Sequence, residues 1–309
     1  DALADADALA DASDPLPTLS SLGFDAPEAT IPEASPSAAR DRLDTFCAGP
    51  IYRYEDARDY PARETTSRLS PHLRWGTLGV RETYAATVEA LESAPDDDAR
   101  DSVTGFRSQL AWREFYAHVL ADAPSMVSRP LRAYEHPVAW REDPDALQRW
   151  KDGRTGFPLV DAGMRQLRAE AWMHNRVRMV VASFLTKDLL LDWREGYAWF
   201  REKLVDHDPA NDAGGWQWAA STGADAQPYF RIFNPTTHAE RYDPDATYVH
   251  EYVPELRGVD AEDVHAWPDL SPADRDELAP DYPGPIVDHA DRREAALAMF
   301  EAARGESGD

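Results

Sequence analysis

The sequence predicts an all-α protein, and three observations support that prediction. Long segments repeat apolar residues with helical periodicity, runs of β-branched residues are few, and proline or glycine separates the helical patterns. The chain has 309 residues, of which 43% are hydrophobic, so it can bury a substantial core. We expect one main helical domain over residues 39–309, preceded by an arm over residues 1–38.

The arm is rich in Ala, Asp, Pro and Ser and has few aromatic residues, a composition typical of a linker. Helical patterns then follow in order along the main domain. They are RDRLDTF (40–46), VRETYAATVEALES (80–93), DSVTGFRSQLAWREFYAHVLA (101–121), VDAGMRQLRAEAWMHNRVRMVVASFLTKDLLL (160–191) and RREAALAMFEAAR (292–304). Helix N-caps are expected at Ser20, Ser37, Asp101 and Asp161.

Several classes of protein are excluded or disfavoured. The single cysteine, Cys47, rules out an internal disulfide, and no apolar run approaches the roughly 18 to 20 residues of a membrane helix. The N-terminus lacks a basic-then-apolar signal segment, so we expect a soluble cytoplasmic protein without membrane contacts. No spacing of His or Cys predicts a metal site, and the glycine-rich nucleotide loops are absent.

The charge balance permits two interpretations. Asp and Glu total 57 against 32 Lys and Arg, which gives a formal net charge of -25. Such a surplus argues against nucleic-acid binding, because attraction to phosphate is its main non-specific contribution. Alternatively, the acidic residues form a uniform coat that keeps the protein soluble in a very salty cytoplasm, and local arginine clusters mark the functional surface.

The stretch GGWQWAASTGADAQPYFRIFNP, residues 214–235, concentrates large aromatic residues. If its start is helical, Trp216 and Trp218 differ by about 200° around the axis, so the rings face opposite ways. One ring could pack in the core while the other lines a cavity, and Gly214 with Gly215 would let a bulky group approach the backbone. The alternative is that both rings are core residues.

Arginines and hydroxyls cluster in two other segments. In AWMHNRVRMV one helical face carries an aromatic ring, a polar side chain and a thioether, from Trp172, Asn175 or Arg176, and Met179. A buried arginine there needs a carboxylate, and the best candidates are Asp206 and Asp208. In TSRLSPHLRWG, residues 66–76, hydroxyls beside an arginine could form an anion cradle or only a helix cap.

In this order the segments resemble the FAD-binding helical domain of the photolyase/cryptochrome family, and within it the class I cyclobutane pyrimidine dimer photolyases. The resemblance runs from Tyr54 to about Pro254 and continues more weakly to the C-terminus. Its strongest parts are residues 54–76, 111–119, 156–167, 172–196 and 214–243. Residues 1–38 would then correspond to the connection from an N-terminal α/β antenna domain that this sequence lacks, so the sequence is either a fragment or works without a second chromophore.

The resemblance implies FAD as cofactor, with reduced FADH⁻ as the active form and an unidentified antenna chromophore. Positions on the phosphate and sugar side are Tyr54, Thr66, Ser67, Arg68, Leu69 and Ser70. Positions around the isoalloxazine and the ribityl or ribose groups are Asn175, Arg178, Asp206, Asp208 and Asp212. An ion pair between Arg178 and Asp206 would supply the partner that a buried arginine needs.

The resemblance also separates the tryptophans by role. Trp216 resembles the first member of an electron relay that continues through Trp193 and Trp140 to the surface. Trp218 and Trp112 resemble the walls of a pocket for a pyrimidine dimer flipped out of UV-damaged DNA, with Met179 beneath them. Arg58, Arg176 and Arg231 resemble residues that grip the DNA backbone.

The implied function is light-driven repair of cyclobutane pyrimidine dimers by electron transfer, performed by a monomer. Two positions differ from the pattern of dimer photolyases. Gln109 stands where the family places a glutamate on the lesion, and Asp212 stands where many members have an asparagine beside the flavin. An aspartate there resembles plant cryptochromes, in which it can stay protonated and give a proton to the flavin, so a blue-light photoreceptor without repair activity is the alternative.

Overall fold

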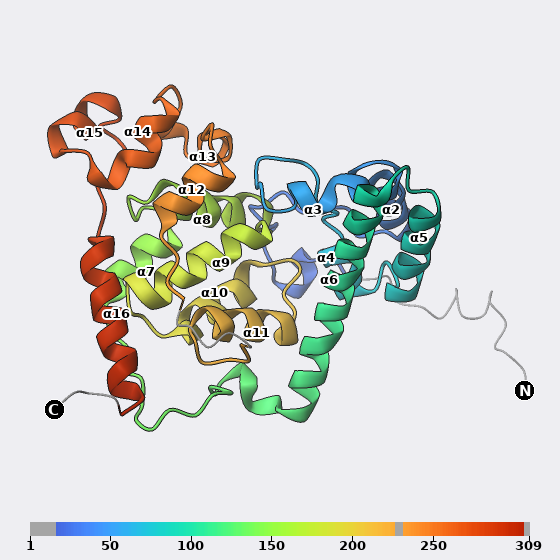
Figure 1. Cartoon of the computed structure of the whole chain (residues 1–309), viewed down its shortest axis with the longest axis horizontal. Helices are drawn as coiled ribbons and strands as arrows, with labels where there is room; N and C mark the ends of the chain where they lie inside the picture. The colour runs from blue at the N-terminus through green and yellow to red at the C-terminus, as the bar shows by residue number, and fades with distance from the viewer. Residues whose placement is uncertain (1–16, 226–230, 306–309) are drawn as a thin grey trace, which may run out of the picture.

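The computed structural model describes residues 17–225 and 231–305, and within these ranges the chain is built from helices (Figure 1). The β-structure in this part of the chain is one isolated bridge between Arg141 and Leu191. The all-α prediction is therefore confirmed. No helix in the same ranges is both long enough and apolar enough to cross a membrane.

The first half of the described chain is organised around α6, a helix of 26 residues over Asp97–Asp122. The N-terminus of α6 is capped by Asp96, whose side chain accepts a hydrogen bond from the Ala99 N–H. The other elements of this half are η1 (Ser20–Leu22), α2 (Pro36–Ala48), η2 (Pro50–Arg53), α3 (Tyr54–Ala57), α4 (Ser70–Trp75), α5 (Val80–Glu92) and η3 (Pro124–Val127).

The second half forms a larger group of helices that ends with α16 (His289–Ala303), which packs on η4 (Phe184–Asp188), a short π-helical turn. The remaining elements are α7 (Pro144–Lys151), α8 (Pro158–Glu170), α9 (Asn175–Ser183), α10 (Trp193–Lys203), α11 (Pro209–Ala219), α12 (Pro235–Tyr242), α13 (Thr247–Tyr252), η5 (Pro254–Leu256), α14 (Ala261–Ala266), η6 (Trp267–Asp269) and α15 (Pro272–Leu278).

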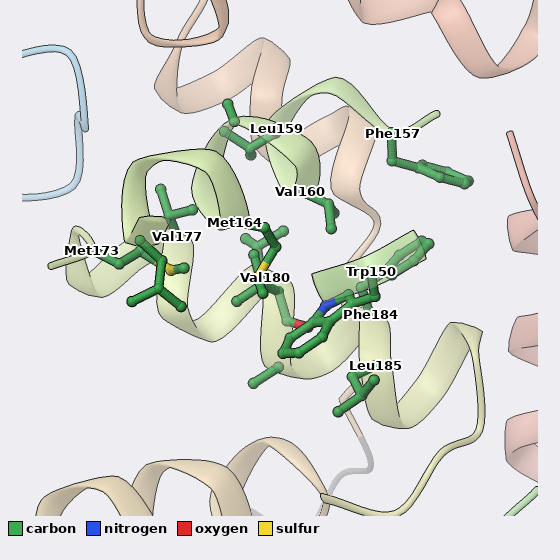
Figure 2. Close-up of a cluster of buried hydrophobic side chains, with 14 of the residues drawn as sticks. Trp150, Phe157, Leu159, Val160, Met164, Met173, Val177, Val180, Phe184 and Leu185 are labelled. Atoms are coloured by element: carbon green, nitrogen blue, oxygen red, sulfur yellow. The ribbon is translucent and has the colours of Figure 1, made fainter. Parts of the chain in front are cut away.

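Two clusters of buried apolar side chains hold the two halves. The larger cluster draws on the helices from α7 to α16, and Figure 2 shows part of it, with Trp150 of α7, Val180 of α9 and Phe184 of η4. The smaller cluster lies between α2, η2, α3, α5 and the first half of α6, with Phe46 and Phe106 among its members. Burial of these side chains contributes most of the folding energy, at roughly 25 cal/mol per Å² of apolar surface.

The helix α6 joins the two halves, because it packs on η2, α3 and α5 at one end and on α11 further along (Figure 1). Its buried residues, Ala99, Ser102, Val103 and Phe106, all lie in the first half of the helix. In the second half, Val119 and Leu120 pack against the larger cluster, and other side chains border the cavities described below.

The segment 160–191, predicted as one helical pattern, folds as three elements. The helix α8 ends where Ala171 adopts a left-handed backbone with φ of 50°, and α9 begins after His174. Trp172 therefore lies in the connection rather than on α9, and its predicted place on one helical face with Asn175 and Met179 is wrong. Asn175 and Met179 do share that face, and the Asn175 amide donates to the Met179 sulfur at 3.8 Å.

The predicted N-caps are also wrong. Ser35 caps α2, because its hydroxyl accepts from the Ala38 N–H and Pro36 follows it at the first helical position. Ser20, Ser37 and Asp101 lie within helical elements. Asp161 lies inside α8, where its buried carboxylate accepts hydrogen bonds from Thr155, from the Gly156 N–H and from the Tyr282 hydroxyl.

The described part of the arm, residues 17–35, contains the 3₁₀ turn η1 and is largely exposed. Its backbone contacts the main body where the Thr30 N–H donates to the Ala169 carbonyl at 2.8 Å. The boundary predicted at residue 38 falls inside α2, which begins at Pro36. Residues 1–16 of the predicted arm lie outside the described residues.

Candidate functional site

Two adjoining cavities, of about 620 and 510 Å³, lie between the second half of α6 and the helices α9 and α11. We call the first the aromatic cavity and the second the polar cavity, after the side chains that line them. Both lie within the size range of small-molecule and cofactor sites. The residues that border both cavities are Gln109, Trp112, Arg113, Asn175, Arg178, Met179, Asn211 and Asp212.

One wall of the polar cavity comes from the segment between α3 and α4, with Thr66 and Ser67, and from Ser70 at the start of α4. Arg68 takes a left-handed backbone with φ of 49°. The Arg68 side chain pairs with Glu170 at 2.8 Å and stacks on the Trp172 ring at 4.3 Å. Its charge is therefore matched within the protein. The Ser67 and Ser70 hydroxyls accept from the Leu69 N–H and the Trp172 indole, so each keeps its own O–H to donate to an anion.

Tyr54 closes the far end of this wall. Its ring makes edge contacts with Phe46 and Phe106 at 6.1 and 5.3 Å, which ties the polar cavity to the smaller core. Burial raises the pKa of Tyr54 above its usual value, although Arg58 opposes the change, so the side chain is a neutral phenol at physiological pH.

Arg178 of α9 carries the charge at the centre of the site. Its guanidinium donates twice from Nη2 to Asp206, at 2.8 and 3.0 Å, and its Nε donates to the Met173 carbonyl at 2.9 Å. Burial opposes the positive charge, but Asp206 and then Asp212 outweigh it and raise the pKa of Arg178. The ion pair with Asp206 predicted for a buried arginine is present.

Asp208 sets the start of α11. Its carboxylate caps the helix by accepting from the N–H groups of Ala210 and Asn211, each at 3.0 Å. Burial works against its charge, but the hydrogen bonds from Asn211 and the nearby Arg74 lower the pKa of Asp208. This cap directs Asn211 and Asp212, in the first turn of α11, into both cavities.

Asp212 is 8% exposed and makes three polar contacts. Its Oδ2 lies 2.7 Å from His207 Nδ1 and accepts the Asp208 N–H at 3.1 Å, and its Oδ1 lies 3.8 Å from Arg178. The Asp212 carboxylate is therefore held in place by contacts from the preceding loop and from α9.

The helix α11 brings Trp216 and Trp218 to the same cavity, contrary to the separation inferred from their spacing. With Gly215 taken as zero, Trp216 lies about 100° to one side and Trp218 about 60° to the other. The predicted angle of about 200° between the two tryptophans therefore leaves about 160° between them on the side of Gly215, and that side of α11 faces the aromatic cavity. A Cβ at Gly215 would meet no atom within 4 Å, so the wall is open between the two rings.

The two rings have different partners. Trp216 is 2% exposed and packs on Phe200 and Trp150, with ring centroids 5.0 and 6.0 Å away. Trp218 is half-buried, and its ring lies 5.9 Å from Phe233 and 5.5 Å from the Arg231 guanidinium. Trp216 is therefore a core residue that also borders the cavity, so the two interpretations of the sequence are both partly right.

The tryptophans of the predicted relay lie on neighbouring segments. A Cβ at Gly196 of α10 would overlap the Trp216 ring, and Trp193, fully buried, lies one helical turn before Gly196. Trp140 precedes Arg141, which forms the bridge with Leu191, two residues before Trp193. Trp140 is half-buried and packs on Phe300 at 5.8 Å. Trp150, the ring nearest Trp216 apart from Phe200, was not predicted.

The opposite wall comes from α6. Gln109, Arg113 and Tyr116 recur at four and three residues and share one face of the helix, and all three border the aromatic cavity. A Cβ at Gly214 would overlap the Tyr116 ring, so this glycine allows α11 to approach α6. Trp112 is 54% exposed and borders both cavities.

The three arginines predicted to contact the DNA backbone differ in exposure and in ion pairing within the protein. Arg231 is exposed at the rim of the aromatic cavity. Arg58 pairs with Glu55 at 3.2 Å, and Arg176 pairs with Asp59 at 2.6 Å and stacks on Tyr242. The charges of Arg58 and Arg176 are therefore compensated by neighbouring carboxylates.

The structure brings the predicted cofactor residues together, since all of them line the polar cavity. They are Tyr54, Thr66, Ser67, Arg68, Leu69, Ser70, Asn175, Arg178, Asp206, Asp208 and Asp212. The predictions missed Arg113, Tyr116, Trp150 and His207. For Arg113 and Tyr116 the helical spacing from Gln109 was an available signal, whereas Trp150 and His207 carry no local signal.

The residues present fit a dinucleotide with a flat ring system. One cavity supplies hydroxyls, carboxylates and a buried guanidinium, and the other supplies aromatic and apolar walls. The indole Nε1 of Trp216 is buried without a hydrogen-bond partner, so this cavity wall contains an unsatisfied donor.

Comparisons with known proteins agree with this architecture. Residues 106–302 match a family described as the FAD binding domain of DNA photolyase. A Halobacterium salinarum protein named deoxyribodipyrimidine photo-lyase is 65% identical over 300 residues, which cover 97% of this chain and 62% of that protein.

Solved structures give the same result. A class III photolyase from Agrobacterium tumefaciens superposes with a TM-score of 0.82 at 42% identity, over 88% of this chain and 56% of that one. A cryptochrome from Synechocystis superposes with a TM-score of 0.83 at 30% identity, over 92% of this chain and 60% of that one. The chain thus spans about 56 to 62% of the length of these relatives.

Proposed function

The chain belongs to the DNA photolyase family, and from this premise we propose that it repairs cyclobutane pyrimidine dimers in DNA by light-driven electron transfer. The observation that carries the proposal is the aromatic cavity of about 620 Å³, which adjoins the polar cavity and is bordered by Trp112, Trp218 and Met179. A sensor of light has no need for such a second, open cavity beside its cofactor.

The cavity walls suit an extruded base pair. Enzymes that act on bases take them out of the duplex, at a cost of a few kcal/mol that is least at damaged sites. Stacking of a base on an aromatic side chain recovers about 1–3 kcal/mol. Trp112 on α6 and Trp218 on α11 would supply the two stacking surfaces, and Met179 on α9 would supply the floor.

The residues of the polar cavity would hold FAD. Thr66, Ser67 and Ser70 would bind its phosphates, and Arg178, Asp206 and Asp212 would orient its ring system. FAD in its reduced form supplies, on excitation, the electron that splits the cyclobutane ring, and it receives that electron back. The protein contributes position and a pocket from which bulk water is excluded.

The tryptophans Trp216, Trp193 and Trp140 would conduct the electrons that reduce the cofactor in light. Trp216 borders the aromatic cavity, Trp193 is fully buried and Trp140 is half-buried, an order of burial that supports a route from the cavity toward the surface. Their role is separate from lesion binding, because Trp193 and Trp140 border neither cavity.

Contacts with the lesion and its strand would come from the cavity rim. Gln109, whose amide donates to the Gly105 carbonyl at 3.4 Å, would hold a thymine edge by hydrogen bonds without a charge. Arg231, Arg58 and Arg176 would contact the backbone. Stacking depends on salt less than phosphate contact does, which suits a strongly acidic monomer that works in a salty cytoplasm.

The test is blue-light repair of an oligonucleotide with one thymine cyclobutane dimer, with FAD-loaded, chemically reduced protein in high salt and a dark control. We expect light-dependent recovery of intact thymines, and strong loss of lesion affinity in Trp218→Ala and Trp112→Ala with FAD retained. Bound, photoreducible FAD without repair would overturn the proposal and favour a cryptochrome-like photoreceptor.

A further inference from the structure

His207 lies in the loop that precedes α11 and contacts the Asp212 carboxylate. Its Nδ1 is 2.7 Å from Asp212 Oδ2, whereas its ring borders neither cavity. Asp212 itself borders both. His207 thus contacts a cavity-lining carboxylate without itself bordering either cavity.

The orientation of the imidazole is defined by its surroundings. The Arg74 guanidinium donates to the His207 carbonyl at 2.5 Å, which anchors the backbone, and the ring meets the Tyr197 ring edge-on at 5.6 Å. With Nδ1 directed at Asp212, Nε2 has no hydrogen-bond partner among the described residues, and the side chain keeps 15% exposure. The second ring nitrogen is therefore the one left for contact with solvent.

We propose that His207 passes protons between the solvent and the cavity through Asp212. This inference rests on the proposed function, because the cavity needs protons when electrons arrive there through the tryptophans. In each passage a hydronium ion gives a proton to Nε2 and leaves as water, the Nδ1–H bond breaks, and an O–H bond forms at Asp212 Oδ2. Asp212 then gives this proton to a base in the cavity and is a carboxylate again. The imidazole is left neutral with its proton on Nε2, and it regains the Nδ1–H form by exchanging protons with water.

The charged groups around the pair are compatible with this role. From α9, Arg178 lies 3.8 Å from Asp212 Oδ1, whereas His207 contacts the other oxygen, Oδ2. From α10, Tyr197 faces the ring, and burial raises its pKa, with Asp212 adding to the rise, so it is a neutral phenol. Arg201 of α10, Arg74 of α4 and the flanking Asp206 and Asp208 complete the set.

The variant His207→Asn distinguishes a role in proton transfer from a purely structural role. Its side-chain N–H can take the place of Nδ1 and donate to Asp212, but it cannot take up and release a proton at physiological pH. His207→Asn therefore keeps the hydrogen bond and removes the passage. His207→Ala removes both and leaves space that free imidazole can fill.

The first measurement uses the flavin-free protein and needs no activity. Nitrogen-15 NMR of the histidine side chains should show His207 hydrogen-bonded through Nδ1, and Asp212→Asn should shift those signals and speed exchange of the Nδ1 proton with water. Unchanged His207 signals in Asp212→Asn would overturn the proposal, because the pair would then be uncoupled.

The second measurement follows proton uptake with an indicator dye after a light flash on FAD-loaded protein. We expect His207→Asn to slow uptake roughly 100-fold with FAD affinity unchanged, the low end of what a positioned proton-transfer group contributes. Imidazole should restore uptake in His207→Ala. Uptake at the wild-type rate in His207→Asn would refute the proposal, since a purely structural role is preserved by that variant.

The matched control is His289→Asn. His289 pairs through Nδ1 with buried Asp188 at 2.5 Å, but this pair lies on α16 and η4, away from both cavities. The variant His289→Asn should therefore leave the rate of proton uptake unchanged. Repair by chemically reduced wild-type protein is measured in parallel. Binding of FAD without repair would disprove the proposed function. The NMR result would still show whether His207 and Asp212 are coupled.

Discussion

Removal of the Asp206 carboxylate is the most direct test of the centre of the site. Arg178 is 19% exposed at its side chain and Asp206 only 2%, and they share two hydrogen bonds of 2.8 and 3.0 Å. Breaking a buried pair by removing one partner costs about 3–5 kcal/mol, because a charge stays buried without compensation. Since Asp212 remains 3.8 Å from Arg178, we expect about 3 kcal/mol for Asp206→Ala.

Urea denaturation gives the measurement. If the dependence of unfolding free energy on urea is about 3 kcal/mol/M, the midpoint should fall by about 1 M. A buried pair is little screened, so the difference from wild type should be similar in low and high salt. The variant should also bind FAD more weakly, because Arg178 and Asp206 both line the polar cavity.

A second buried pair provides the control. Arg165 and Glu255 are joined by hydrogen bonds of 2.5 and 3.0 Å, with side chains 17% and 21% exposed, and neither residue borders the two cavities. Glu255→Ala should destabilise the fold and leave FAD affinity unchanged. A loss below about 1 kcal/mol in Asp206→Ala, the range of an exposed pair, would refute the reasoning.

Three further predictions concern the walls and the pH dependence. Trp216→Phe should slow photoreduction while repair by pre-reduced protein continues, whereas Trp218→Ala should weaken lesion binding with FAD retained; loss of FAD in Trp218→Ala with unchanged lesion affinity would contradict this. Gln109→Glu should keep repair but make lesion binding pH-dependent near the carboxyl pKa, as measured by titration of affinity. Burial lowers the pKa of His174 from 6.5 to about 4, so the unfolded chain binds more protons in this window. About 3 kcal/mol of stability is therefore lost as the pH falls through it, and His174→Asn should flatten that part of the acid-denaturation curve.

Local sequence was sufficient for the fold class and for most of the polar cavity. Helical periodicity predicted the helices, and the resemblance of residues 66–70 and 206–212 to one family placed their side chains in a common site. The need of a buried arginine for a carboxylate pointed to Asp206 or Asp208, the family resemblance implied Asp206, and that pair is present. These inferences depend on near neighbours or on general rules of burial, which the sequence contains.

Helix ends were harder to predict. A break at Ala171, where the backbone turns left-handed, removed Trp172 from the face predicted for it, and nothing in the periodicity of residues 160–191 signals that break. The cap of α2 is Ser35 rather than Ser37, although Pro36 at the first helical position was a usable sign.

The sequence by itself determined an all-α chain, the residue types of the site and the angle of about 200° between Trp216 and Trp218. Tertiary structure alone decided that both rings border one cavity, that Arg68 pairs with Glu170, and that Trp150 packs on Trp216. The reason is that periodicity gives the direction of a side chain relative to its own helix. What lies in that direction depends on packing with residues far away in the chain, as with Arg68 and Glu170, which are 102 positions apart.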